Sequence, residues 1–204
     1  MEQTLKNLPI GIQDFESLIN DGYLYVDKTA LMHRLVSTGR YYFLSRPRRF
    51  GKSLLISTLR AYFLGKKDLF KGLAVEQLEQ KWTVHPVLHL DLNTAKYKEP
   101  GKLDAVLDKT LSKWEKLYDI KPHDPDFGMR FEDVIQCAYE KTGERVVILV
   151  DEYDKPLLET IDNEALQEDY RSTLKSFYGA LKSKDDCIKF AMLTGVTKFG
   201  KVSV

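Results

Sequence analysis

The sequence predicts an α/β fold built on a mainly parallel sheet. Strand-like segments alternate with helical segments along the 204 residues, which is the order expected when helices connect parallel strands. The segment RVVILVD (145–151) is a continuous aliphatic run, typical of a strand buried on both faces of a parallel sheet. Neither an internal repeat nor a low-complexity linker interrupts this alternation.

The first 40 residues are interpreted as a lead-in segment and a helix that packs on the core. Residues 22–39 begin with a short extended piece and continue as a helix. Asp27 or Thr29 can cap the start of this helix, and Gly39 stops it.

The core is predicted over residues 41–204 from the spacing of apolar residues. The predicted strands are 41–45, 86–92, 145–151 and 187–195, and the predicted helices are 52–64, 103–117, 124–143 and 166–181. The chain stops about ten residues after the fourth strand without a closing helix. We therefore expect a core that is incomplete at its C-terminus, with an exposed sheet edge there, as in a piece of a longer protein.

Composition excludes several classes of function. Lys and Arg total 31 against 30 Asp and Glu, so no overall charge attracts nucleic acid or an anionic membrane. Cys137 and Cys187 have no second Cys or His at ligand spacing, which argues against a disulfide framework or a zinc site. There is no secretory signal, and the longest aliphatic run is far shorter than the ~18 residues that span a bilayer. A cytoplasmic protein without a membrane partner is expected.

The segment RPRRFGKS (46–53) has the second half of a phosphate-binding loop, placed between a predicted strand and a predicted helix. Such a loop works because backbone N–H groups converge on phosphates at a helix N-terminus. Gly51 lets the backbone come close, Lys52 reaches the β- and γ-phosphates, and the Ser53 hydroxyl ligates magnesium. These residues predict a site for ATP and Mg²⁺.

The first half of the loop departs from the usual pattern. Arg46 stands where the pattern has glycine, and Pro47 lacks an N–H group. The amides that face the phosphates are expected from residue 48 onward, at Arg48, Arg49, Phe50, Gly51, Lys52, Ser53 and Leu54. The arginines add positive charge beside a polyanion. The alternative is a basic turn that only caps a core helix.

The segment VVILVDEYD is a second motif, an aliphatic strand that ends in Asp151 and Glu152. In phosphate-loop enzymes with an additional strand, the first acid binds magnesium through water and the second polarises the attacking water. This class places one strand between its two motifs, so residues 188–194 should lie between 41–45 and 146–151. The alternative is a strand end capped by acids in solvent.

Thr194 ends the fourth strand and suits a position that senses the γ-phosphate, although a plain strand end before a turn at Gly195 explains it nearly as well. Other titratable residues are weaker candidates. His85 and His89 lie on one face of a strand but pair poorly as a metal site. Asp91 is interpreted as a strand-end residue. For His33 and His123 the sequence identifies no partner.

Taken together, the segments YLYVDKTALMHRL, SRPRRFGKSLLISTL, LFKGL, LHLDL, VVILVDEYDKPL and MLTGVTKFGKVSV resemble the bacterial AAA-ATPase-like proteins over essentially the whole chain. The resemblance implies a three-layer P-loop NTPase fold of the additional-strand type, with arginine in place of the first loop glycine as a family trait. It also implies a restriction-endonuclease-like C-terminal domain outside this chain, through which nucleic acid could bind. Tyr25 or Val26 would flank the adenine, unless they are only a hydrophobic lead-in.

The sequence therefore predicts an ATP-binding domain with Mg²⁺-dependent hydrolysis. Lys52, Glu152 and Thr194 would be the catalytic residues, and Ser53 and Asp151 would hold the metal. A non-hydrolysing nucleotide switch or scaffold is an alternative, and a nucleic-acid module that uses RPRR is a second one. The sequence leaves the oligomeric state undecided and is compatible with a homo-oligomer, since an arginine finger could come from Arg48 or Arg49 or from a neighbouring subunit.

Overall fold

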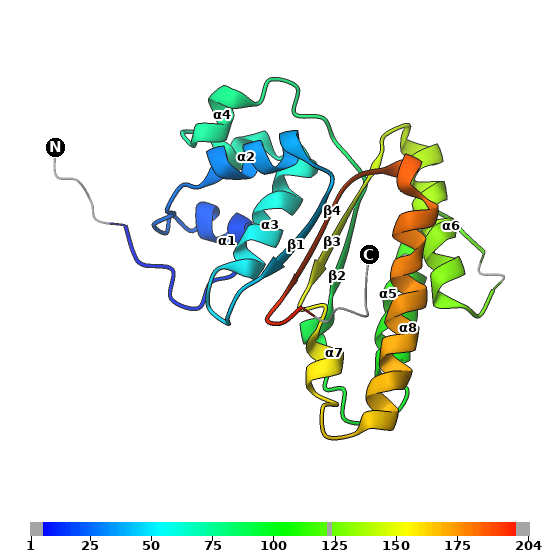
Figure 1. Cartoon of the computed structure of the whole chain (residues 1–204). Helices are drawn as coiled ribbons and strands as arrows, with labels where there is room; N and C mark the ends of the chain where they lie inside the picture. Colours follow the sequence, from blue (N-terminus) through cyan, green and yellow to red (C-terminus); the bar gives the residue numbers. More distant parts are fainter. Residues whose placement is uncertain (1–5, 122–123, 199–204) are drawn as a thin grey trace, which may run out of the picture.

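The computed structural model describes residues 6–121 and 124–198, so His123 lies outside the described residues. Four parallel strands form one sheet (Figure 1). They are β1 (Tyr41–Ser45), β2 (Val87–Asp91), β3 (Val146–Asp151) and β4 (Ile188–Gly195). The α/β class with a parallel sheet, predicted from the alternation of elements, is confirmed.

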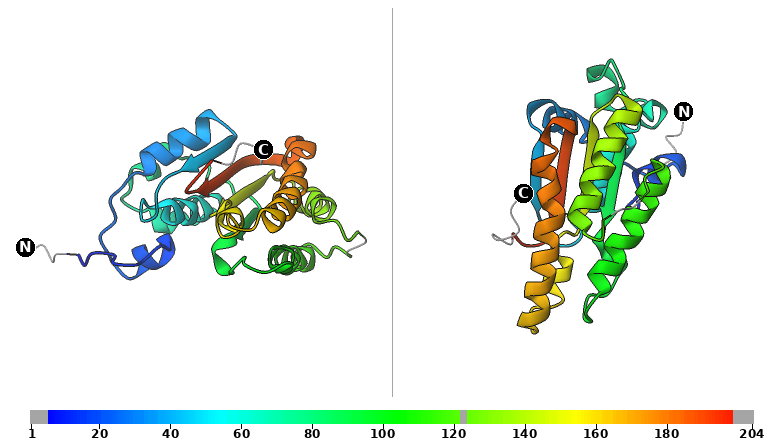
Figure 2. Two further views of the ribbon diagram at one scale, coloured as in Figure 1. Left: turned by 60° about the horizontal axis from the view of Figure 1, so that its bottom comes forward. Right: turned by 90° about the vertical axis from the view of Figure 1, so that its right-hand side faces the viewer.

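Helices cover both faces of the sheet, which gives three layers (Figure 2). One face carries α1 (Phe15–Asn20), α2 (Thr29–Thr38), α3 (Lys52–Phe63) and α4 (Ala74–Leu78). The other face carries α5 (Lys102–Leu117), α6 (Phe127–Thr142) and α8 (Glu164–Ser183), and the short α7 (Lys155–Leu158) follows β3. Three 3₁₀ turns complete the described elements at Lys67–Phe70, Leu92–Thr94 and Asp185–Cys187.

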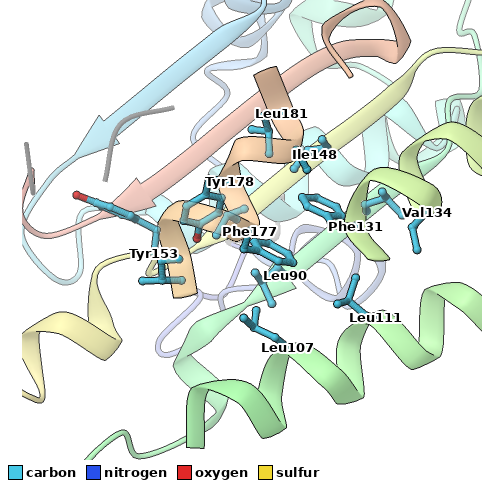
Figure 3. Packing of buried hydrophobic residues seen from close by; sticks show 14 of the residues in the cluster. Leu90, Leu107, Leu111, Phe131, Val134, Ile148, Tyr153, Phe177, Tyr178 and Leu181 are labelled. Carbon is cyan, nitrogen blue, oxygen red and sulfur yellow. The ribbon is translucent and has the colours of Figure 1, made fainter. Parts of the chain in front are cut away.

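Strand β3 lies at the centre because its side chains are apolar on both faces. Val147 and Leu149 belong to the core under α3, whereas Ile148 and Val150 belong to the core under the helices of the opposite face. On that opposite face, side chains of α5, α6 and α8 gather on Ile148 and its neighbours (Figure 3). Alternation of side chains along an extended strand therefore supplies both cores from one segment.

The strand order is β1-β4-β3-β2, so β4 separates the strand before the phosphate loop from the strand that ends in acids. This confirms the predicted position of residues 188–194. The exposed edge, however, was predicted at the wrong strand. β4 pairs on both sides, and among the described strands β1 and β2 have one unpaired side each.

The N-terminal segment contributes α1, which the sequence analysis did not predict. Asp14 caps α1 by accepting from the backbone N–H of Ser17 at 2.9 Å, and the N–H of Phe15 donates to the Ser57 hydroxyl of α3 at 2.9 Å. The N-cap of α2 is Lys28 and not Asp27 or Thr29 as predicted, although the Asp27 carboxylate accepts from the backbone N–H of Thr29 at 2.8 Å. Through these contacts the segment preceding β1 is joined to the phosphate-loop helix.

Candidate nucleotide site

The loop between β1 and α3 has the backbone of an anion site. Arg49 and Gly51 both have left-handed backbone, with φ of 68° and 76°. For a non-glycine residue such as Arg49 this conformation costs roughly 1–2 kcal/mol. Gly51 is the N-cap of α3 and offers no side chain to the first amides of the helix. Those amides have no partner within the helix and are available to donate to an anion in the loop.

Lys52 is held inside the loop. Its side chain is nearly buried, and its Nζ donates to the carbonyl oxygens of Arg46 at 3.1 Å and Pro47 at 3.4 Å. The same Nζ forms an ion pair with Glu152 Oε1 at 3.2 Å. A buried ammonium without partners would cost several kcal/mol, so these oxygens stabilise Lys52. The unusual first half of the loop thus supplies acceptors through its backbone, which does not depend on the side chain at residue 46.

The two acids at the end of β3 point to different partners. Asp151 is buried, and its Oδ1 accepts a hydrogen bond from the Thr194 hydroxyl of β4. Glu152 has left-handed backbone, with φ of 54°, and its carboxylate meets Lys52. Strained backbone of this kind is concentrated at functional sites, because the surrounding structure must hold it in place.

A cleft of about 790 Å³ opens beside this cluster, a size in the range of small-molecule sites. The phosphate loop and α3 line it with Arg48, Arg49, Gly51, Lys52, Ser53 and Leu54. Asn93, Glu152, Lys155, Leu158 and Glu159 line the side that follows β2 and β3. The N-terminal segment closes the remaining side with Ile10, Gly11, Ile12 and Gln13.

Of the residues predicted to bind phosphate or metal or to act in catalysis, most line this cleft and three do not. Phe50 is at the tip of the loop, with 68% of its surface exposed, and its side chain is not part of the lining. Asp151 and Thr194 lie behind the lining and are bonded to each other. These two residues can therefore act on a ligand only through their neighbours or after a rearrangement.

The N-terminal wall of the cleft was missed by the sequence analysis. Tyr25 packs its ring against Phe15 at 5.1 Å between ring centroids, and neither Tyr25 nor Val26 lines the cleft. Residues 10–13 form this wall of the cleft instead. A hydrogen bond from the Ser57 hydroxyl to the Gln13 carbonyl oxygen, at 3.1 Å, holds them in place. The pair of isoleucines around Gly11 in a lead-in loop was the signal available in the sequence.

The oxygen ligands present fit magnesium bound together with a nucleotide. Within residues 6–121 and 124–198, no three His, Cys, Asp or Glu side chains gather in a way that could hold a metal. Magnesium needs no such cage, because it usually takes one or two carboxylates and fills its shell with water and substrate phosphates. The Ser53 hydroxyl and the Asp151 carboxylate are ligands of this type.

His85, which precedes β2, and His89 of β2 are not part of the cleft lining. His85 Nδ1 is 2.9 Å from the Arg145 carbonyl oxygen, and burial lowers the pKa of His85. Burial also lowers the pKa of His89. In the described part of the chain, no helix has the length and apolarity needed to cross a membrane.

The sheet order and the loop geometry define a P-loop NTPase of the additional-strand class, because β4 stands between the loop strand and the acid strand. The chain belongs to the family described as "Predicted AAA-ATPase", whose profile matches residues 9–204. It is 40% identical over 200 residues to a protein of Azotobacter chroococcum mcd 1 described as "Uncharacterized protein in vnfD 5'region". That match covers 98% of this chain and 39% of the relative.

Proposed function

We propose that this chain is an ATP-binding domain that hydrolyses ATP in the presence of Mg²⁺. Membership of a predicted ATPase family indicates nucleotide binding. The observation that carries the finer proposal is the 3.2 Å contact between Lys52 and Glu152 at the N-terminus of α3. A cation that would bind phosphate and a carboxylate that would act on water therefore lie side by side in the cleft.

The phosphates would occupy the N-terminus of α3, where free amides and the helix dipole favour negative charge. Lys52 would bind them directly, and Arg48 and Arg49 would add positive charge at the rim of the cleft. The base would lie against Ile10 and Ile12, whose side chains supply an apolar wall. The cleft would then offer positive charge to the phosphates and apolar side chains to the base.

Ser53 would hold the magnesium ion directly, and Asp151 would hold it through a water molecule. When bound, the ion offsets charge on the β- and γ-phosphates. Thr194 would keep the Asp151 carboxylate aligned through the hydrogen bond between their side chains. From the same position at the end of β4, Thr194 would respond to the γ-phosphate.

Glu152 would act on the attacking water. In the structure its carboxylate is paired with Lys52. A γ-phosphate that takes over Lys52 would leave the carboxylate free to align a water molecule and accept its proton. The water oxygen bonds to the γ-phosphorus, the bond to the β-phosphate oxygen breaks, and ADP and inorganic phosphate are released.

The test compares Glu152→Gln with Asp151→Asn in the full-length protein. The first change should leave ATP affinity nearly intact and slow hydrolysis at least tenfold, since an aligned base contributes roughly 10²–10⁴ in rate. The second should weaken Mg²⁺-dependent binding itself, because it removes a charge near the metal. If wild type hydrolyses no faster than Glu152→Gln, the nucleotide acts only as a switch.

Hydrolysis would drive or gate another module or partner, because the relative that this chain matches is much longer than the matched region. A C-terminal nuclease-like module is the partner that the family resemblance suggests. ATP-dependent cleavage of DNA by the full-length protein, lost in Lys52→Ala, would support this. Cleavage that is independent of ATP would contradict it.

A further inference from the structure

Asp154 is a fully buried carboxylate two residues after Glu152, and the mechanism above gives it no role. It stands at the N-cap of α7 but makes no side-chain capping bond to that helix. Its Oδ2 instead accepts from the backbone N–H groups of Val196 at 2.8 Å and Thr197 at 2.6 Å, and from the Thr197 hydroxyl at 2.9 Å. The carboxylate therefore binds the loop that follows β4.

Burial of this charge is expensive and only partly compensated. A buried carboxylate needs hydrogen bonds to replace the water it loses. Asp154 Oδ2 has three such bonds, whereas Oδ1 has no partner among the described residues. A buried carboxylate with one oxygen unpaired contributes little to stability. We therefore look for a role of Asp154 in positioning the loop that it binds.

The loop bound by Asp154 is also attached to the phosphate loop. The Ser45 hydroxyl donates to the Val196 carbonyl oxygen at 2.8 Å. The backbone N–H of Arg46 donates to the Gly195 carbonyl oxygen at 3.1 Å. A shift of residues 195–197 would consequently be transmitted through these bonds to Ser45 and Arg46, at the entry to the phosphate loop.

The same loop is attached to the acid motif by further bonds. The backbone N–H of Tyr153 donates to the Thr194 carbonyl oxygen at 2.9 Å, and the Tyr153 hydroxyl donates to the Thr197 carbonyl oxygen at 3.0 Å. Thr194 in turn bonds to Asp151. The loop after β4 thus bridges the two halves of the candidate site.

Gly195 is what allows this close packing. A Cβ atom at residue 195 would lie 2.6 Å from Asp154 Oδ1 and 2.7 Å from the Tyr153 ring. Both distances are too short for carbon, so any side chain would push the loop off Asp154. The approach of the loop to the carboxylate therefore depends on the absence of a side chain.

We propose that Asp154 is a positioning residue that fixes the loop after β4 against the acid motif, and so keeps Thr194 on Asp151 and Glu152 at Lys52. This role rests on the proposed ATPase function. We expect turnover to suffer more than binding, because the hydrogen bonds of the Asp154 side chain go to Val196 and Thr197 and, among the described residues, none goes to Lys52 or to the N-terminus of α3. Misplacement of catalytic groups by about 1 Å can cost roughly 10²-fold in rate.

The test measures ATP affinity and turnover in full-length Asp154→Ala and Asp154→Asn. The alanine variant should lose at least tenfold in kcat, with ATP affinity within about threefold of wild type. The asparagine variant keeps an acceptor for the 196–197 amides and should recover most of the loss. Gly195→Ala keeps the Asp154 carboxylate but crowds it and displaces the loop. It should reproduce the loss seen in Asp154→Ala, and it tests the proposal if Asp154→Ala does not fold.

Asp126→Ala is the matched control, because Asp126 also bonds a backbone amide, that of Met129 at 2.9 Å, but caps α6 away from the cleft lining. It should lower stability and leave kcat unchanged. Wild-type kcat in Asp154→Ala would overturn the positioning role, and so would a parallel loss of ATP affinity and kcat. Failure of wild type to bind ATP would instead overturn the proposed function from which the role follows.

Discussion

Lys52 carries its charge inside the protein and shares it between loop carbonyl oxygens and one carboxylate. The carbonyl oxygens of Arg46 and Pro47 belong to the loop itself and can stay in place when a ligand binds. The Glu152 carboxylate cannot serve Lys52 and a water molecule equally well. Under the proposed function, a phosphate that competes for Lys52 would couple nucleotide binding to the release of Glu152.

We predict that Lys52→Ala weakens ATP binding about tenfold to a hundredfold, because a charge-assisted contact to phosphate contributes roughly 1.5–3 kcal/mol. Titration calorimetry with Mg²⁺ and ATP measures the change. Lys141→Ala is the control, since Lys141 pairs with exposed Asp119 on the surface, away from the cleft lining. Equal affinities in wild type and Lys52→Ala would contradict the phosphate-loop assignment.

A second residue-scale prediction concerns His85. Burial lowers the pKa of His85 below its ordinary value of about 6.5, although its bond to the Arg145 carbonyl oxygen opposes this. Between the two values the unfolded chain binds more protons, so stability should fall as pH drops through about 6.5 and level off below the folded pKa.

His85→Gln should reduce this fall, because glutamine does not titrate and can still donate to a carbonyl oxygen. Urea unfolding at pH 7.5 and pH 5.5 in both proteins measures it, in a range above the ordinary titration of carboxylates. Part of the fall should remain in the variant, since burial lowers the pKa of His89 in the same direction. An identical pH dependence in the two proteins would show that His85 contributes nothing.

At the scale of elements, α5 and α6 are joined by a buried ion pair rather than by apolar contact alone. Arg130 of α6 donates to Glu115 of α5 through Nε at 2.7 Å and Nη2 at 2.8 Å, and through Nη1 to Asp108 at 2.7 Å. Beside the pair, the rings of Phe131 and Phe177 stack with centroids 4.3 Å apart. This layer supports the sheet from the face opposite α3.

We predict that Glu115→Leu alone destabilises the protein by about 3–5 kcal/mol, because it leaves the Arg130 charge buried with one partner less. The double variant Arg130→Met with Glu115→Leu should regain most of that loss, since a buried ion pair can be replaced by apolar residues at little cost. Urea unfolding of wild type, both single variants and the double variant completes the cycle. A double variant as unstable as the sum of the singles would contradict this.

At the scale of the whole molecule, one sheet separates two cores and carries the candidate site at the ends of its strands. β3 and β4 contribute side chains to both cores, so neither helical layer can be lost without exposing the central strands. A ligand bound at the strand ends acts on this shared part of the structure. It should therefore stabilise the entire described fold and not the phosphate loop alone.

We predict that ATP with Mg²⁺ at about 100 times its Kd raises stability by about 2.7 kcal/mol. For a chain of this size the corresponding rise in Tm is about 5–10 °C. Scanning calorimetry should show one transition that moves upward as a whole in wild type and stays in place in Lys52→Ala. A shift confined to part of the transition would show that the two helical layers unfold separately.

Local patterns in the sequence were sufficient to predict most of the helices and strands. The aliphatic run of β3 and the period of α5, α6 and α8 are properties of consecutive residues, and the structure confirms them. The start of α3 directly after Gly51 is equally local, as is the acid pair after β3. The short helices α1, α4 and α7 were missed because so few residues display no clear helical period.

The internal position of β4 was predicted correctly, because the motifs indicated the additional-strand class of P-loop NTPases. The exposed edge of the sheet was predicted at the wrong strand, because the order of strands in the chain does not indicate their order in the sheet. Only the tertiary structure decided that Lys52 pairs with Glu152, that Ile10–Gln13 line the cleft, and that Asp154 binds the loop after β4. These contacts join segments that lie tens of residues apart in the chain. Their energies depend on burial and on distance in space, and neither quantity is recorded by the spacing of neighbouring residues.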